Sequence, residues 1–178
     1  MYTRKKMLIV DGYNVLRSGS RYRDIQGPDY TDDAFNHARE TLINDVVNYA
    51  GRDYEAVIVF DGGGNAFSEG QPETIGGVKI VFSPAGQSAD KVIEKLAHEA
   101  SEHEIETLVI TSDATIQNTV FGGGVDRMSA NGFSCEVGMY YHEAELDEKP
   151  KMASKNTVAG RLDQATLEKL RALRDGQS

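Results

Sequence analysis

Carboxylate and carboxamide side chains recur in this chain where short apolar runs end. The first run, residues 7–10 (Met-Leu-Ile-Val), delivers Asp11 and Asn14, three residues apart, to the point where it stops. An apolar run of this length bounded by glycine is typical of a buried strand, and open parallel sheets bind ligands at the carboxyl ends of their strands. We therefore expect Asp11 and Asn14 to lie at an active site.

Three further aspartates stand at comparable places. Asp61 directly follows the apolar run 56–60, and Asp113 comes shortly after the run 107–110. Asp90 lies in the first turn of an expected helix. If the four aspartates converge on one crevice, their charges repel one another, and a divalent cation would compensate them. Oxygen ligands without a Cys/His cluster favour Mg²⁺ or Mn²⁺ over zinc.

Each of these residues also has an ordinary structural explanation. An aspartate after a strand often forms a turn or, like Asp113 before residue 114, caps a helix. The helix dipole alone favours an acid at the position of Asp90. Asn14 could adopt a left-handed turn conformation, hold Asp11 in one rotamer or bind a metal-bound water. Recurrence at four places lowers the weight of the purely structural explanation.

The elements that must position these side chains are strands that alternate with helices. The apolar runs predict strands over residues 7–10, 56–60, 78–82, 107–110 and 136–141. Helical spacing predicts helices over residues 31–49, 88–103, 114–121 and 163–173, with Thr31 to Asp33 and Ser88 as caps. Such alternation predicts a Rossmann-like three-layer α/β sandwich with a mainly parallel central sheet.

Length and composition suit one compact domain. The 178 residues, 39% of them hydrophobic, are enough for a two-sided core. We expect this domain to span residues 1–142, and residues 143–178 to form a polar connector and a C-terminal helix that packs on the same domain. The single cysteine, Cys135, and the lack of a signal peptide or a long apolar run favour a soluble, cytoplasmic protein without a membrane segment.

The charge of the chain bears on its partners. A formal net charge of -9 lowers the expectation of a polyanionic partner, because nucleic-acid affinity comes mostly from Lys and Arg. It does not exclude one. Carboxylates that hold divalent cations can act on phosphates, because the cations screen the negative charges from each other.

Several short motifs occur together in a specific order. They are residues 10–14 (Val-Asp-Gly-Tyr-Asn), 59–61 (Val-Phe-Asp), 88–96 and 111–113 (Thr-Ser-Asp), followed by Gln117, Gly124, Arg127 and Ser129. In this order and spacing the chain resembles the YacP-like NYN family of PIN-like ribonucleases, over about residues 8–130 and loosely at the terminal helix. The resemblance implies a metal-dependent endoribonuclease, and the best-known kind of relative is ribosome-associated and cuts messenger RNA.

Carried over residue by residue, the resemblance makes Asp11 and Asp90 the strongest catalytic candidates. Asn14, Asp61 and Asp113 complete the acidic pocket, and the four aspartates are the expected metal ligands. Two positions depart from the family pattern, because relatives tend to have Glu where Gln87 stands and His soon after the strand-end Asp, where this chain has Gly62 and Gly63. In addition, residues 143–156 carry mixed charges rather than the basic stretch expected for docking to ribosomal RNA.

The expected substrate contacts are Tyr13, Ser112, Arg127 and Ser129. Tyr13 and Arg127 are candidates for stacking on a base or steadying the cleaved strand, and Arg127 and Ser129 for contacting phosphate. The alternatives are ordinary packing for Tyr13, a surface salt bridge for Arg127 and a helix cap for Ser129.

The reaction that fits best is hydrolysis of an RNA phosphodiester by water activated by one or two Mg²⁺ or Mn²⁺ ions. A noncatalytic RNA- or ribosome-binding module with a degenerate metal site is the main alternative, and Gln87 and the missing His favour it slightly. A phosphatase ranks last, because Asp11-Gly-Tyr lacks the second Asp that an aspartyl-phosphate enzyme would use two residues later.

Overall fold

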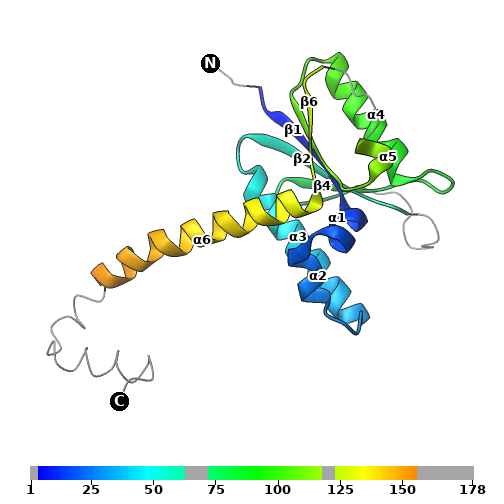
Figure 1. Cartoon of the computed structure of the whole chain (residues 1–178). Coiled ribbons are helices and arrows are strands. Elements are labelled where there is room, and N and C mark those ends of the chain that lie inside the picture. Colours follow the sequence, from blue (N-terminus) through cyan, green and yellow to red (C-terminus); the bar gives the residue numbers. More distant parts are fainter. Residues whose placement is uncertain (1–3, 63–71, 118–122, 156–178) are drawn as a thin grey trace, which may run out of the picture. The chain divides into compact units, whose positions relative to one another are not determined.

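The computed structural model describes residues 4–62, 72–117 and 123–155 (Figure 1). The elements follow the order β1 (Lys6–Asp11), α1 (Gly12–Ser18), α2 (Ser20–Gln26), α3 (Asp32–Ala50), β2 (Tyr54–Phe60), β3 (Glu73–Ile75), β4 (Val78–Phe82), α4 (Ala89–Glu102), β5 (Thr107–Ile110), α5 (Ala114–Gln117), β6 (Val125–Met128) and α6 (Ala130–Lys155). The chain divides into two compact units, residues 1–137 and 138–178, and every strand belongs to the first.

The six strands form one sheet in the order β3-β4-β2-β1-β5-β6. All neighbouring strands are parallel except β3, which pairs antiparallel with β4. The central strand β1 pairs with β2 on one side and with β5 on the other. The mainly parallel α/β sandwich expected from the sequence is confirmed.

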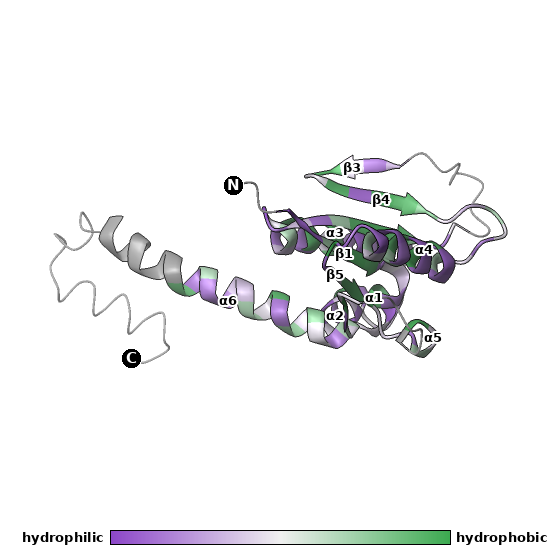
Figure 2. Cartoon of the chain, turned by 90° about the horizontal axis from the view of Figure 1, so that it is seen from above, coloured by the Kyte–Doolittle hydropathy of each residue, from purple (hydrophilic) through white to green (hydrophobic). Residues whose placement is uncertain are grey.

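The strands β1, β2 and β5 form the centre of the sheet because their side chains are mostly apolar and buried on both faces. Ile9 and its neighbours Val57 and Val109 pack on one face in a cluster that also contains Ile93 and Ala97 of α4. Alternate residues of a strand point to the opposite face, where α1 and α3 contact the sheet. In Figure 2 the strands β1 and β5 are accordingly hydrophobic, and α4 shows hydrophilic residues on its outer side.

The order of the strands fixes where a ligand can bind. Helices α1 to α3 connect β1 to β2, whereas α4 lies on the other face and leads from β4 back to β5, on the far side of β1. The connections therefore leave β1 in opposite directions. Such a switch point opens a crevice at the carboxyl ends of the strands, which here is the end that carries Asp11.

The helix starts follow local chemistry. Thr31 caps α3, because its side chain accepts a 3.2 Å hydrogen bond from the Ala34 N–H. Ser88 occupies the cap position of α4 without a side-chain capping bond. Gly12 starts α1 directly against a core ring, since a Cβ at this position would lie 2.3 Å from Cε1 of Phe60. Only glycine allows the helix to turn so closely onto the end of the sheet.

The strand predicted over residues 136–141 is wrong, because this segment lies inside α6. The buried residues Ala130, Phe133, Ser134 and Val137 follow the spacing of a helix face, and they decide the conformation. The apolar side chains that suggested a strand, Met139 and Tyr140, are 61% and 51% exposed. A local run of apolar residues therefore did not indicate burial.

Five elements were not predicted: α1, α2, β3, β6 and α6. The hairpin between β3 and β4 has a sequence signal, because its two-residue loop is Gly76-Gly77, both with positive φ (57° and 85°). Of the short helix predicted over residues 114–121, α5 occupies Ala114–Gln117, and the rest lies outside the described residues. The helix predicted over residues 163–173 also lies outside them. Within the described ranges, the helices are all too short or too polar to cross a membrane.

Candidate active site

One pocket of about 200 Å³ lies at the carboxyl ends of β1, β2 and β5. Its lining residues are Asp11, Tyr13, Asn14, Arg17, Asp61, Ser88, Ala89, Asp90 and Asp113. All four aspartates singled out in the sequence therefore line the same pocket. They come from three strand ends and one helix start, which the parallel sheet brings to a common edge.

The four aspartates differ in their burial. Asp11 ends β1 and is only 5% exposed. Asp90 in the first turn of α4 and Asp113 after β5 are half-buried, while Asp61 is exposed just after β2. Asp113 also caps the helix that follows, because its Oδ1 accepts a 2.8 Å hydrogen bond from the Thr115 N–H. The capping alternative for Asp113 is thus realised together with its place in the pocket.

Asp11 is held by a neighbouring strand end. The hydroxyl of Thr111 donates a 2.9 Å hydrogen bond to Oδ2 of Asp11. The same hydroxyl accepts a 3.1 Å hydrogen bond from the backbone N–H of Asp113. Thr111 is completely buried, so it joins two of the acidic residues through a fixed, solvent-excluded contact.

Asn14 fastens helix α1 to the segment after β5. Its Oδ1 accepts a 2.7 Å hydrogen bond from the Ser112 N–H, and the Ser112 hydroxyl in turn accepts a 2.8 Å bond from the Ala130 N–H. Asn14 is helical in α1 rather than in a left-handed turn. Its amide oxygen therefore has a positioning role in this arrangement.

The pocket raises the pKa of two of its carboxyl groups, those of Asp11 and Asp90. Burial raises the pKa of Asp11 from 3.8 to about 6, against the lowering effect of the Thr111 hydrogen bond, and the charges of Asp90 and Asp113 add to the rise. The pKa of Asp90 is also raised, first by burial and then by the charges of Asp113, Glu94 and Asp61. The aspartates thus interact electrostatically, which is the condition that favours a bound cation.

The donor chemistry suits an oxygen-binding divalent cation such as Mg²⁺ or Mn²⁺, since the described residues that line the pocket offer carboxylates and no thiolate or imidazole. As their side chains stand, no three His, Cys, Asp or Glu residues in the described part of the chain are close enough to hold one metal ion together. Joint coordination therefore requires rotation of side chains. Asp11 is held in place by Thr111, and Asp61, although exposed, accepts a 3.4 Å hydrogen bond from the Ser83 hydroxyl.

The expected substrate contacts are distributed unevenly. Tyr13 lines the pocket, and its ring also packs 4.9 Å from Phe60, so it has a packing role as well. The hydroxyl of Ser129 accepts a 2.9 Å bond from the Gly132 N–H, which makes it a cap of α6. Ser112, Ser129 and Arg127, which is exposed on the edge strand β6, are not among the residues that line the acidic pocket.

Arg17, Ser88 and Ala89 also line the pocket although they were not predicted to, and no separate role was predicted for Thr111. Arg17 lies one turn after Asn14 on the same side of α1. Its place at the pocket could therefore be predicted only from a sequence reading that included this helix. Ser88 and Ala89 follow from the position of Asp90. Thr111 is the residue next to the end of β5, where its neighbour across the sheet is Asp11.

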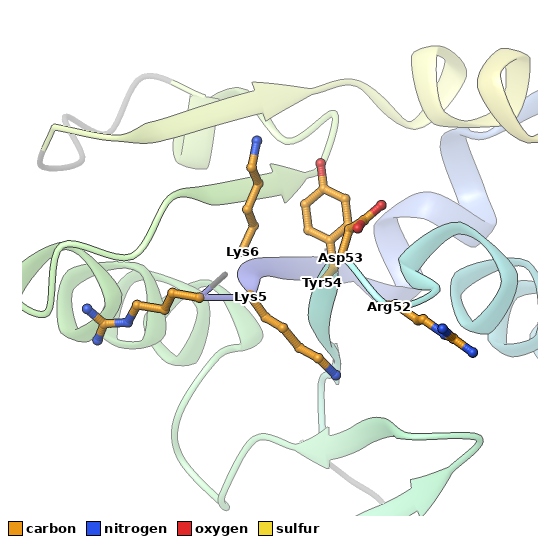
Figure 3. A pocket seen from close by; sticks show the side chains of 6 residues that line it. Lys5, Lys6, Arg52, Asp53 and Tyr54 are labelled. Carbon is orange, nitrogen blue, oxygen red and sulfur yellow. The ribbon is translucent and has the colours of Figure 1, made fainter. Parts of the chain in front are cut away.

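A second pocket, of about 360 Å³, lies at the opposite edge of the sheet, where β1 and β2 begin. It is lined by Arg4, Lys5, Lys6, Arg52, Asp53 and Tyr54. Figure 3 shows the side chains of Lys5, Lys6 and Arg52 pointing in different directions. Lys6 is already paired with Glu106 at 2.8 Å. The cationic side chains do not converge on one point, so this pocket lacks the arrangement of a catalytic centre.

The fold and the acidic pocket together define a PIN-like α/β domain. The YacP-like NYN domain family matches residues 8–175, and the chain belongs to this family. NYN domains are PIN-like nucleases, and such nucleases generally use divalent metals. The class expected from the sequence motifs is thereby confirmed.

Individual relatives agree with this assignment. The chain is 28% identical over 156 residues to the uncharacterized protein YacP of Bacillus subtilis (strain 168), with 88% of each chain covered. It is also similar to the crystal structure of Rae1 (YacP) from Bacillus subtilis, with a TM-score of 0.64 and 26% identity over 96% of this chain and 95% of that one. A point mutant of Rae1 matches with the same TM-score and 27% identity over 83% of both chains.

Proposed function

We propose that this protein is a divalent-metal-dependent endoribonuclease that hydrolyses phosphodiester bonds of RNA. The observation that carries the proposal is the gathering of Asp11, Asp61, Asp90 and Asp113 in one pocket at the switch point of the sheet. Membership of the YacP-like NYN family supports a nuclease. The family resemblance further supports messenger RNA as the substrate, in the cytoplasm and in association with the ribosome.

The four aspartates are the residues that would hold Mg²⁺ or Mn²⁺. When bound, such a cation supplies Lewis-acid chemistry, because it activates water for attack and offsets charge on the phosphoryl oxygens. Asp11 is the anchor of the group, since it is buried and hydrogen-bonded to Thr111. The side chains of Asp61 and Asp90, which are more exposed, would rotate toward the cation that Asp11 binds.

Two neighbours keep this arrangement in place. The Thr111 hydroxyl fixes the Asp11 carboxylate, and Asn14 fixes the backbone at Ser112, two residues after β5. Tyr13 gives the pocket an aromatic wall, supported from behind by Phe60. A nucleotide base that stacks on this wall would place its phosphate beside the carboxylates. Among the residues that the structure describes, the pocket lining offers no Cys, His or Lys nucleophile, which favours attack by water.

The test follows RNA cleavage and thermal stability together during a titration with Mn²⁺. We expect cleavage of a single-stranded RNA and a metal-dependent rise in melting temperature. Asp11→Asn and Asp90→Asn should abolish cleavage and reduce the rise. Asp24→Asn on the exposed surface of α2 removes the same charge outside the pocket and should change neither result.

The noncatalytic binding module is the second candidate. It is favoured by the side-chain positions, since no three acidic residues in the described part of the chain reach one ion as they stand, and by Gln87 at a position where relatives tend to carry Glu. This candidate predicts RNA binding without product and without a Mn²⁺-dependent rise in melting temperature. That result would refute the nuclease proposal.

A further inference from the structure

Arg17 is the one cationic residue among the described residues that line the acidic pocket. It lies in the last turn of α1, one turn beyond Asn14 and four residues beyond Tyr13, so all three share one side of the helix. Its side chain is exposed, and it forms no ion pair or hydrogen bond with any residue that the structure describes. An arginine beside four carboxylates would ordinarily pair with one of them.

The neighbouring arginine shows the contrast. Arg21 in α2 donates to both oxygens of Asp45, at 2.8 and 3.3 Å, and Asp45 is 1% exposed. Tyr22 donates a third hydrogen bond, of 2.8 Å, to the same carboxylate. Arg21 is therefore used to join α2 to α3. Arg17 has no comparable structural partner among the described residues, which leaves its guanidinium available to a ligand.

The backbone around Arg17 is held firmly. The N–H of Gly19 donates a 2.8 Å hydrogen bond to the Val15 carbonyl, which ends α1 one residue after Ser18. A Cβ at position 19 would lie 2.7 Å from that carbonyl oxygen and 2.8 Å from the Ser134 hydroxyl, so the backbone at Gly19 is closely packed. The base of the Arg17 side chain is thus fixed, although its guanidinium reaches solvent.

We propose that Arg17 binds the phosphate of the RNA strand in the acidic pocket, an inference that rests on the proposed function for the identity of the substrate. A phosphodiester carries one negative charge and is repelled by the four carboxylates. A divalent cation reduces that repulsion, and the guanidinium adds an attractive contact to the phosphate oxygens. Its planar fork can donate two parallel hydrogen bonds, which an ammonium group cannot reproduce.

The position of Arg17 also suits a single strand. Tyr13 and Arg17 are four residues apart in one helix, so an aromatic ring and a guanidinium stand side by side along the pocket. Stacking of a base on an aromatic ring combined with a cation at the backbone is how proteins hold single-stranded nucleic acid. Arg17 would thereby align the strand with the aspartates.

The test measures RNA affinity first, by fluorescence anisotropy of a labelled single-stranded RNA in the presence of Mn²⁺. The Asp11→Asn chain, which should not cut the probe, serves as the background. Adding Arg17→Ala should weaken binding about tenfold or more, and Arg17→Lys should weaken it less. The slope of log affinity against log salt concentration should become shallower by about one unit, which is the contribution of one phosphate contact. Arg23→Ala on α2 removes one exposed charge outside the pocket and should leave affinity within about twofold.

The cleavage assay then separates this inference from the proposed function. In the otherwise unchanged chain, Arg17→Ala should reduce kcat/KM while the Mn²⁺-dependent rise in melting temperature stays the same. If the protein cleaves RNA and Arg17→Ala behaves like Arg23→Ala, the Arg17 inference is overturned and the nuclease proposal stands. If the protein does not cleave but RNA affinity still depends on Arg17, the nuclease proposal fails and the phosphate contact stands. If affinity does not depend on Arg17 either, both are refuted.

Discussion

Thr111 and Asp11 are separated by 100 positions in the sequence, yet the Thr111 hydroxyl donates a 2.9 Å hydrogen bond to Asp11 Oδ2. Both residues stand at the ends of adjacent parallel strands, β5 and β1, and both are buried. The contact sets the direction of the most buried carboxylate in the acidic pocket. It is therefore the structural element through which the sheet positions the candidate metal site.

Replacement of Thr111 by Val keeps the shape of the side chain and removes the hydroxyl. Asp11 then loses a donor that stabilises its charged form, so the pKa of Asp11 should rise above about 6. We expect destabilisation of about 1 kcal/mol or more at neutral pH. A higher Mn²⁺ concentration should also be needed for the thermal shift.

Thr111→Ser is the matched control, because it restores the hydroxyl. It should recover most of the Mn²⁺ response even if packing is slightly worse. Equal Mn²⁺ midpoints for the Val and Ser variants would show that the hydrogen bond does not prepare the site.

The pH dependence of stability should report the raised pKa of Asp11. A carboxyl group with a folded-state pKa of about 6 and an ordinary value of 3.8 binds its proton more tightly in the folded chain. The stability that it contributes is complete below about pH 4 and is lost as the pH rises through about 6. In EDTA, the unfolding free energy should fall by on the order of 3 kcal/mol from this group alone.

Urea denaturation of the wild type and of Asp11→Asn between about pH 4 and pH 8 measures this effect. In the Asp11→Asn variant, the unfolding free energy should depend much less on pH in this range. The variant should also be at least as stable as the wild type at the upper end, since a buried charge has been removed. If the unfolding free energy of Asp11→Asn changed with pH as strongly as that of the wild type, a group other than Asp11 would be the one that titrates.

Gly12 should tolerate no side chain. Gly12→Ala places a methyl group within 2.3 Å of the Phe60 ring, at the point where β1 passes into α1. We expect a loss of about 1–3 kcal/mol, because helix and sheet must separate to admit the methyl group. Chemical denaturation gives the number directly.

Gly138→Ala provides the comparison within a helix. A Cβ at this position in α6 meets nothing within 4 Å, so the substitution should be neutral or stabilising by up to about 1 kcal/mol. If the two alanine variants were equally stable, close packing of Gly12 on Phe60 would not be the reason for the glycine.

The sequence was sufficient to predict the sheet edge that carries the site. The runs before Asp11, Asp61 and Asp113 are apolar on both faces, and this pattern is typical of buried parallel strands. Strand ends of a parallel sheet share one edge, so the meeting of these residues in one pocket followed from topology. Thr31 was likewise readable as a cap, because capping depends on neighbouring residues only.

Other features depend on contacts that are distant in sequence. The helical conformation of residues 136–141 is decided by Phe133 and Val137, which the fold buries, and not by the exposed Tyr140. The Asn14 side chain bonds to Ser112 across 98 positions, which no local pattern announces. Arg17 became visible only once α1 placed it beside the aspartates. The missed hairpin at Gly76-Gly77 is different, since its local signal was present.

The most direct test of the central claim is crystallography of the protein soaked with Mn²⁺, with the ion located by its anomalous signal. We predict an Mn²⁺ ion in the acidic pocket, with oxygens of Asp11 and of at least one of Asp61, Asp90 and Asp113 in its coordination sphere. Side chains that turn inward relative to the present structure would explain how carboxylates that now stand apart come to share an ion. Saturating Mn²⁺ that leaves this pocket empty, or that binds elsewhere under conditions in which RNA is cleaved, would contradict the account.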